Sequence, residues 1–115
     1  MRLADGRSAG LAGGIEHVVD NSVDYVHGLA VCDMNNDGEL DVVAAEMQQS
    51  PQKRVMVYLN KGGAVKWECQ VIAHTGSHNI CVAGIGNTGY LDIIGANWSG
   101  EYQPVEMWMQ LPPKR

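Results

Sequence analysis

The chain has 115 residues, which is enough for one small domain but not for two. Its hydrophobic content of 45% is too high for a largely disordered chain, and its net charge of −5 argues against binding to nucleic acid, whose phosphate backbone requires a basic patch. The sequence contains no transmembrane-length apolar run and no signal-peptide core, so we expect no membrane partner, and the cellular compartment is left open.

Residues 1–13 are expected to be a flexible, Gly-rich tail and residues 111–115 a C-terminal tail, on either side of one domain at 14–110. Within that domain, short runs rich in Val, Ile, Tyr and Trp alternate with turn residues, and helix signals are nearly absent. The pattern predicts an all-β fold. In chain order, the expected strands are Gly14–Asp20, the two halves of His27–Met47, Arg54–Asn60, Lys66–Ala73, the two halves of His78–Trp98, and Val105–Gln110.

The domain repeats itself. His27–Met47 aligns without a gap with His78–Trp98, and similar runs precede and follow each copy. We expect two repeats, at about 27–77 and 78–110, each a four-stranded antiparallel unit of the size of a β-propeller blade. The stretch "GIGNTG" at Gly84–Gly89 spells the glycine fingerprint of dinucleotide-binding folds, but no helix pattern follows it. Its glycines therefore indicate a hairpin turn.

The corresponding turn of the first copy, "DMNNDGELD", is acidic. Its side-chain oxygens at relative positions 1, 3, 5 and 9 belong to Asp33, Asn35, Asp37 and Asp41. Gly38 permits a sharp turn, and the carbonyl of Glu39 at position 7 would add a backbone ligand, a set of hard oxygen donors that suits Ca²⁺. The loop is not an EF-hand, because position 12 is Ala44 and flanking helices are not indicated. The alternative is a plain hairpin turn with solvated acids.

In the second copy, the same four positions hold Gly84, Gly86, Thr88 and Asp92. Only one carboxylate remains, so this loop is expected to keep the hairpin shape without an ion. The prediction is one Ca²⁺ per chain, in the first repeat. Asp92 is expected to contribute little beyond a contact within its hairpin.

The pattern D-x-N-x-D-G-x-x-D in Asp33–Asp41, followed by "VVAAE", "RVMVYLN", "W…QVIA" and "GSHN", resembles the FG-GAP/VCBS repeat over about Ile15–Gln110. This family comprises the Ca²⁺-binding β-propeller blades of integrin α-subunits and of many bacterial surface and carbohydrate-active proteins. The resemblance implies that the ion lies in the hairpin between the first and second strands of a blade. It also implies about six to eight blades, whereas two blades leave apolar faces and strand edges in water.

The order of the strands suggests how the ring is completed. Gly14–Asp20 precedes the first repeat as Lys66–Ala73 precedes the second, so the chain has a spare outer strand while its second blade lacks one. We expect this strand to complete the last blade of a neighbouring copy. Repetition of that contact would close a cyclic homo-oligomer, a trimer or a tetramer. The alternative is that the chain is a fragment of a longer propeller.

At the end of the blades opposite the acidic loop, the resemblance implies a channel mouth. The residues placed there are His27, Glu46, His78, Asn97, Trp98, Glu101 and Tyr102. Aromatic faces beside amide and carboxylate groups suit sugar hydroxyls and apolar sugar faces, so the expected ligand is a carbohydrate or a protein surface. The alternative for His27 and His78 is that they pack between the two blades.

Together these features predict a calcium-stabilised propeller module that binds a ligand and is not an enzyme. The alternative functions are a polysaccharide lyase or hydrolase of the propeller type, or a fragment without a function. Cys32, Cys69 and Cys81 lack metal-binding or redox spacing, and each is expected to be a buried free thiol.

Overall fold

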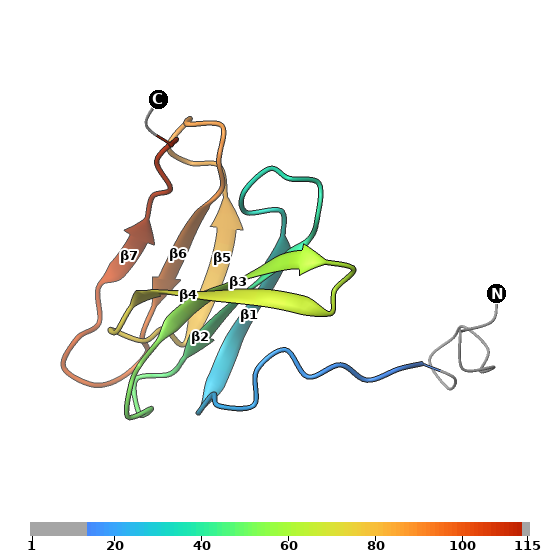
Figure 1. The fold of residues 1–115 in the computed structure, drawn as a ribbon. Coiled ribbons are helices and arrows are strands. Elements are labelled where there is room, and N and C mark those ends of the chain that lie inside the picture. Colours follow the sequence, from blue (N-terminus) through green and yellow to red (C-terminus); the bar gives the residue numbers. More distant parts are fainter. Residues whose placement is uncertain (1–13, 114–115) are drawn as a thin grey trace.

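The computed structural model describes residues 14–113, which contain seven strands and no helix (Figure 1). The expected tail at 1–13 lies outside the described residues, as do residues 114–115. The strands are β1 (Val26–Cys32), β2 (Asp41–Glu46), β3 (Val55–Gly62), β4 (Lys66–Ala73), β5 (Asn79–Ala83), β6 (Asp92–Ala96) and β7 (Val105–Trp108). They form two antiparallel sheets, ordered β1-β2-β3-β4 and β5-β6-β7. The all-β prediction is confirmed. No helix of membrane-spanning length and apolarity occurs in residues 14–113.

The two sheets follow the sequence repeat. The hairpin between β1 and β2 and the hairpin between β5 and β6 have the same backbone shape, because Asn36 and Asn87 both have φ near +56° (58° and 55°) and Gly38 and Gly89 both have φ of 88°. A strand, β6, follows "GIGNTG". The helix that a dinucleotide site requires is therefore absent at this point, and the stretch is a hairpin turn.

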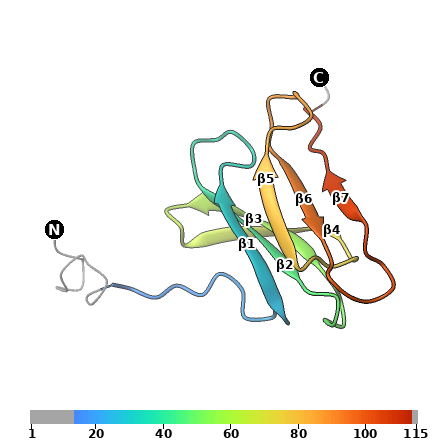
Figure 2. The same cartoon turned by 180° about the vertical axis from the view of Figure 1, so that it is seen from behind.

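The eighth expected strand is not formed. Gly14–Asp20 has no regular secondary structure, so the strand expected there is absent from the single chain. The two sheets have four and three strands, which agrees with the expectation that the second blade lacks its outer strand. A strand requires a hydrogen-bonded neighbour, and none of the seven strands in residues 14–113 pairs with the segment. Figures 1 and 2 show it leading away from both sheets.

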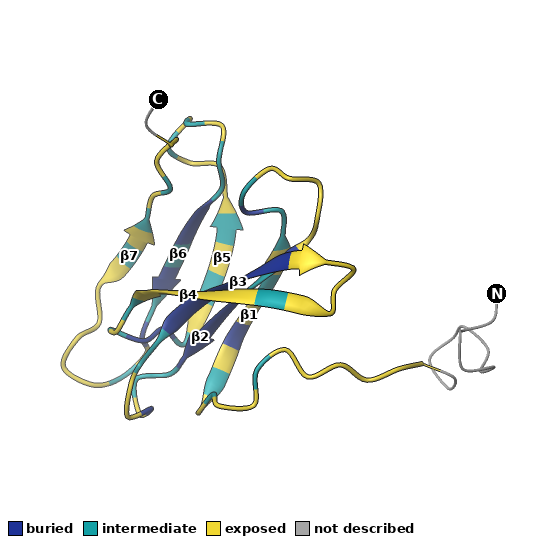
Figure 3. Cartoon of the chain, viewed as in Figure 1, coloured by how far each residue is buried: buried dark blue, intermediate teal, exposed yellow. Residues whose placement is uncertain are grey.

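The main core lies between the two sheets, where β2, β3 and β6 are the most buried strands (Figure 3). Val43, Val57 and Leu59 from the first sheet meet Ile93 from the second, and the buried Met34 closes the cluster. The partly buried residues packed around it are Ala30, Cys32, Ile80, Val82, Leu91 and Trp108. One face of each sheet is thus used inside the chain.

Close approach of β1 to β5 depends on a glycine. A Cβ atom at Gly28 would lie 3.1 Å from Cγ1 of Ile80 and 3.4 Å from its backbone nitrogen. The absence of a side chain at Gly28 therefore lets β5 pass beside β1, as both views show (Figures 1 and 2).

The opposite face of the first sheet carries a second apolar cluster of Ala44, Met56 and Tyr58, against which Val23 packs. The hydroxyl of Tyr58 donates a hydrogen bond to Asp20 Oδ2 at 2.7 Å. Burial, together with this bond, raises the pKa of Tyr58. The chain just before β1 is therefore anchored across part of this face.

Each sheet contains one fully buried aspartate at the start of its second strand. Asp41 accepts hydrogen bonds from the backbone N–H groups of Met34 and Asn60, both at 2.8 Å. These bonds tie the hairpin loop before β2 to the far end of β3. The carboxylate thereby satisfies backbone donors that β2 itself does not reach.

Asp92 does the same in the second sheet. It accepts hydrogen bonds from the backbone N–H groups of Ile85 (3.0 Å), Gly86 (2.8 Å) and Gln110 (2.9 Å). The bonds from Gly86 and Gln110 lower the pKa of Asp92. The expectation that this residue makes only a minor hairpin contact is therefore wrong, because sequence alone did not indicate that its carboxylate joins two separate segments.

The expected burial of the cysteines is wrong for two of the three. Cys32 is half-buried, whereas Cys69 and Cys81 are exposed. Both exposed thiols lie on the faces of the sheets that point away from the core between them, since Cys69 is paired with Tyr58 and Cys81 with Ile94. Alternation along a strand placed them on faces that no second sheet covers.

Asp92→Ala is expected to lower the melting temperature by several degrees, because three backbone N–H groups lose their acceptor. Thermal unfolding followed by circular dichroism measures this. Glu101→Ala, which removes an exposed carboxylate, is the control and should melt like the wild type. Equal melting of the two variants would show that the Asp92 bonds do not hold the sheet.

Candidate metal centre and ligand surface

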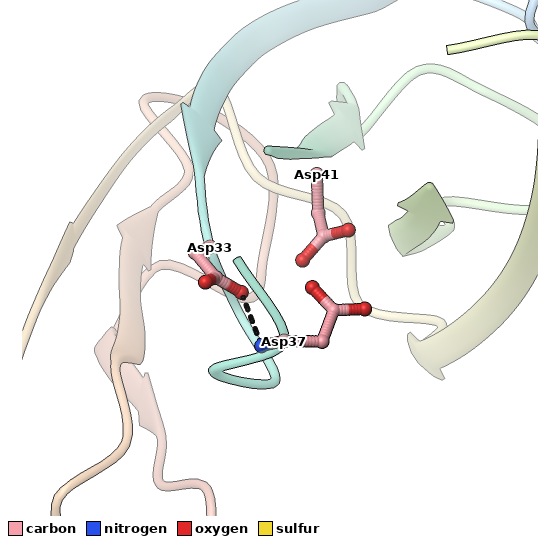
Figure 4. A group of neighbouring side chains, drawn as sticks. All are labelled: Asp33, Asp37 and Asp41. Carbon is pink, nitrogen blue, oxygen red and sulfur yellow. Dashed lines mark hydrogen bonds between the residues drawn. The ribbon is translucent and has the colours of Figure 1, made fainter. Parts of the chain in front are cut away.

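The hairpin between β1 and β2 gathers three carboxylates. Asp33 follows the last residue of β1, Asp41 is the first residue of β2, and Asp37 lies between them in the loop. One carboxylate oxygen from each lies within 4.8 Å of the other two. Figure 4 shows the carboxyl groups of Asp37 and Asp41 pointing toward one another, with that of Asp33 beside them. The expected grouping of these three residues is therefore present.

Backbone N–H groups fold the loop around these carboxylates. Asp33 accepts bonds from Asp37 N (3.2 Å) and Gly38 N (2.8 Å), and Asp37 Oδ1 accepts one from Glu39 N (2.9 Å). The positive φ at Asn36 and Gly38 turns the chain so that these donors point inward. The loop is thus preformed by its own backbone.

The three negative charges repel one another. At 4.8 Å, two unit charges repel by about 0.9 kcal/mol in bulk water and by about 3.5 kcal/mol at an effective dielectric constant near 20. Asp41 is fully buried, Asp33 is half-buried and Asp37 is exposed, so the pairs lie between these limits. A cation in the loop would reverse the sign of this energy.

The remaining predicted ligands are Asn35 and Glu39. The side-chain oxygen Oδ1 of Asn35 is buried and has no hydrogen-bond partner, which leaves an acceptor that lacks a donor. Glu39 is exposed, and its expected contribution through the backbone carbonyl stays a prediction. An unpaired amide oxygen in the same loop as three carboxylates fits a hard cation better than it fits an empty turn.

The loop between β5 and β6 has the same shape but different contents. In place of Asp37 it has Thr88, whose hydroxyl donates to the carbonyl of Gln110 at 3.1 Å and accepts from Tyr90 N at 3.2 Å. A neutral hydroxyl therefore closes this loop by hydrogen bonds. The second repeat offers one carboxylate, Asp92, and both of its oxygens accept backbone N–H groups.

The two loops are tied to each other. Asn36 Nδ2 donates to the carbonyl of Gly89 at 2.9 Å. The side chain of Gln110 donates to the carbonyls of Met34 (2.8 Å) and Leu91 (3.1 Å), so that it links one loop to the other. Sequence reasoning missed this role of Gln110, because its partners lie in different repeats.

Comparison of the chain with protein-family models, with curated proteins and with solved structures found no match.

At the opposite end of the sheets, the two repeated histidines stack. The rings of His27 and His78 have centroids 4.0 Å apart and an interplanar angle of 25°. The ring of Trp98 meets His78 edge-on at 5.9 Å. His27 Nδ1 donates to the carbonyl of His78 at 2.8 Å, and because a carbonyl only accepts, the proton of a neutral His27 ring lies on Nδ1. His27, His78 and Trp98 thus form one aromatic cluster.

Trp98 belongs to the loop after β6, together with two further predicted residues, Glu101 and Tyr102. Trp98 is 65% exposed and Tyr102 is 51% exposed, and Glu101 between them is also exposed. The hydroxyl of Tyr102 donates to Glu106 at 3.1 Å. The exposed aromatic surface of this end is therefore provided by the loop, next to the stacked histidines.

Glu46 is fully buried and does not form part of that surface. It forms an ion pair with Arg54, whose Nη2 lies 2.7 Å from Oε2 and whose backbone N–H donates to Oε1 at 2.9 Å. Ser50 and the backbone N–H of Asp24 donate to the same carboxylate. Glu46 at the end of β2 therefore joins the segment before β1 to the connection between β2 and β3.

These contacts determine the ionisation of Glu46. Burial by itself raises its pKa, but the hydrogen bonds from Arg54, Asp24 and Ser50 outweigh burial and lower the pKa from 4.5 to about 2. Sequence reasoning missed Arg54, because only the turn that brings β3 beside β2 places it next to Glu46. In this structure the predicted ligand-binding residue supports the end of the sheet.

Asn97 is likewise buried. Its Nδ2 donates to the carbonyls of Thr75 (3.0 Å) and Tyr102 (3.2 Å), which holds the loop after β6 against the connection before β5. Of the predicted mouth residues, the structure thus brings His27, His78 and Trp98 into contact, leaves Tyr102 and Glu101 exposed, and buries Glu46 and Asn97.

Arg54→Met is expected to destabilise the protein by about 3 to 5 kcal/mol, because it leaves the buried carboxylate of Glu46 without its cation. Chemical unfolding near neutral pH measures this loss. Replacement of an exposed cation, Lys61→Met, is the control and should change stability little.

The same ion pair makes stability depend on pH. Because the pKa of Glu46 is about 2 in the folded state and near 4.5 without its partners, its contribution is complete above pH 4.5 and is lost as the pH falls toward 2. Unfolding free energy measured between pH 2 and 6 should fall over this window in the wild type. The fall should be smaller in Arg54→Met, and identical slopes would contradict the assignment.

Proposed function

We propose that the chain is a calcium-stabilised pair of β-propeller blades that serves as a binding module without enzymatic activity and is completed by further copies of itself. One observation carries the proposal: three carboxylates and an unpaired amide oxygen occur in a preformed hairpin loop, Asp33–Asp41. The resemblance of this loop to the FG-GAP/VCBS pattern, and the two sheets arranged as repeats, support the blade assignment.

The donor set favours Ca²⁺. The residues that would hold the ion are Asp33, Asn35, Asp37 and Asp41 by their side chains and Glu39 by its carbonyl. Two oxygens bound to one Ca²⁺ at about 2.3–2.6 Å lie at most about 5 Å apart, so carboxylate oxygens within 4.8 Å of one another fit around a single ion. The ion would neutralise the mutual repulsion of the carboxylates and fix the loop.

One ion per chain follows from the contrast between the loops. Thr88 holds the second loop by hydrogen bonds to Gln110 and Tyr90, where the first loop offers carboxylates. Since Asn36 bonds to Gly89, an ordered first loop also supports the second. Calcium would therefore stabilise the contact between the two blades as well as its own hairpin.

The expected ligand is a carbohydrate, with a protein surface as the other class. Trp98 exposes an aromatic face beside the stacked pair of His27 and His78, and Tyr102 of the same loop exposes another. Aromatic faces contact the apolar faces of sugars, while ring nitrogens and hydroxyl groups bond to sugar hydroxyls. The buried Glu46 and Asn97 support this surface through hydrogen bonds with Arg54 and Thr75.

Calcium should raise the stability of the wild type by about 2.7 kcal/mol at a hundredfold excess over its dissociation constant, because it binds only the folded loop. Asp37→Asn should abolish this increase, since it removes a charged ligand while its side-chain oxygen still accepts the bond from Glu39 N. Melting temperature with calcium and with a chelator measures both.

Glu39→Gln is the matched control. It removes a negative charge from the same exposed loop but keeps the backbone carbonyl that is expected to bind the ion. This variant should retain the calcium-dependent increase. If Asp37→Asn and Glu39→Gln respond to calcium alike, or if the wild type does not respond, the metal assignment is wrong.

Glycan binding is expected to weaken at least tenfold in Trp98→Ala, because the largest exposed aromatic face of the surface is lost. A glycan array identifies the sugar, and titration calorimetry with that sugar compares the variants. Val65→Ala, which removes an exposed apolar side chain at the turn between β3 and β4, should bind like the wild type. Equal loss in both variants, or an array without any bound glycan, would contradict the carbohydrate assignment.

A further inference from the structure

We infer that copies of the chain join head to tail, with the outer face of the second sheet of one copy packed on the outer face of the first sheet of the next. The inference rests on the assembly proposed above and names its surfaces. The first-sheet outer face is the surface of Leu29, Val31, Val42, Ala44, Met56 and Tyr58. The second-sheet outer face is the surface of Cys81, Ile94, Val105 and Met107. Each face is defined by the strand register, in which alternate residues point to opposite sides.

The contact inside the chain supplies the template. There, the face of the first sheet that contains Val43 and Val57 packs on the face of the second sheet that contains Ile80, Val82 and Ile93. The two sheets are repeats of each other, but the contact uses different faces of them. It is therefore a heterologous contact, which leaves one face of each sheet without another sheet against it. On the first-sheet outer face, Ala44, Met56 and Tyr58 are already buried beside Val23, whereas Leu29 and Val31 are exposed.

The first-sheet outer face is the counterpart of the buried face of the second sheet. In the alignment of the repeats, Leu29 matches Ile80 and Val31 matches Val82. Ile80 and Val82 are partly buried in the core between the sheets, whereas Leu29 is 66% exposed and Val31 is 64% exposed. These two residues have the side chains of an interface but no sheet against them.

The second-sheet outer face is the counterpart of the buried face of the first sheet, which contains Val43 and Val57. Ile94 matches Val43 by the alignment, and Met107 matches Val57 because Met107 pairs with Ile94 as Val57 pairs with Val43. Val43 and Val57 are buried in the core, whereas Met107 is 46% exposed. The two outer faces of one chain thus carry the two halves of the contact that already exists within it, and a second copy supplies the missing partner for each.

The segment Gly14–Asp20 fits the same arrangement. Within the chain, β4 belongs to the first sheet and leads directly into β5 of the second. Gly14–Asp20 precedes β1 as β4 precedes β5. By this correspondence, Gly14–Asp20 should belong to the sheet that packs on the first-sheet outer face. Among the described residues, the second sheet has three strands, and no strand pairs with the outer edge of β7. Gly14–Asp20 therefore adds to β7 of the neighbouring copy as its fourth strand.

A groove of about 590 Å³ marks the place for this strand. It lies between the first sheet and β7, and its walls include Leu59, Gln70 and Ile72 from β3 and β4 and Trp108 from β7. Among the described residues, the second sheet has no fourth strand to pack opposite β4 of the first sheet. Ile15, Val18 and Val19 of the incoming segment are exposed in the single chain and supply apolar side chains for the groove.

Two substitutions test the faces. Light scattering after size exclusion, in calcium, should give the wild type a mass of three or four times the chain mass of 12.5 kDa. Leu29→Glu and Met107→Glu each place a negative charge on one outer face and should each reduce the mass to that of the monomer. A mixture of the two variants should give a particle of twice the chain mass, because each variant retains the face that the other has lost.

Leu40→Glu is the control, since Leu40 is 60% exposed in the acidic hairpin, outside both faces, and should keep the wild-type mass. Circular dichroism checks that each variant is folded, and Val31→Glu replaces Leu29→Glu if that variant is not. A mixture that stays monomeric, or variants that keep the wild-type mass, would overturn the inference. If the variants keep the wild-type mass, the proposed assembly holds but uses other surfaces. If the wild type is a monomer, both the assembly and these surfaces are rejected.

Discussion

The fold depends on one buried carboxylate in each sheet, placed where the second strand begins. Asp41 and Asp92 each accept backbone N–H groups from the hairpin that precedes them. Each also accepts one from a distant residue, Asn60 in β3 for Asp41 and Gln110 just after β7 for Asp92. A fully buried charge is costly unless it is hydrogen-bonded, and here several backbone donors that would otherwise be unsatisfied are its partners. This interaction fixes the shape of both hairpin loops, whatever other residues they contain.

On that common frame the two repeats have diverged chemically. In the first loop, Asp33 and Asp37 add charge around Asp41, while in the second loop the Thr88 hydroxyl closes the turn. The loops contact each other through Asn36 and Gln110, so the stability of one bears on the other. A cation in the first loop would therefore act on the packing of the two sheets, and through it on the aromatic surface at their other end.

Repetition also explains why a chain with a packed core still exposes apolar sheet faces. The contact between the two sheets uses one face of the first sheet and the non-equivalent face of the second. With two sheets in the described residues, the other face of each has no sheet packed against it. Leu29 and Met107 are exposed for the same reason, although they lie on different sheets. If copies stack as proposed, the histidine and tryptophan clusters recur around the assembly, which suits multivalent binding of a repetitive ligand such as a polysaccharide.

The sequence by itself determined seven strands, the repeat and the hairpin turns, because period-two apolar patterns and glycines at positive φ are local properties. The strand expected at Gly14–Asp20 is not formed, because a strand also needs a neighbour to pair with. It also grouped Asp33, Asp37 and Asp41, since all three belong to one short loop. Only the tertiary structure decided which carboxylates are structural: the partners of Asp92 and Glu46 come from other strands, and no spacing along the chain reveals them. Burial of Glu46 and exposure of Cys69 and Cys81 were missed for the same reason, because the faces that another element covers depend on how the two sheets pack.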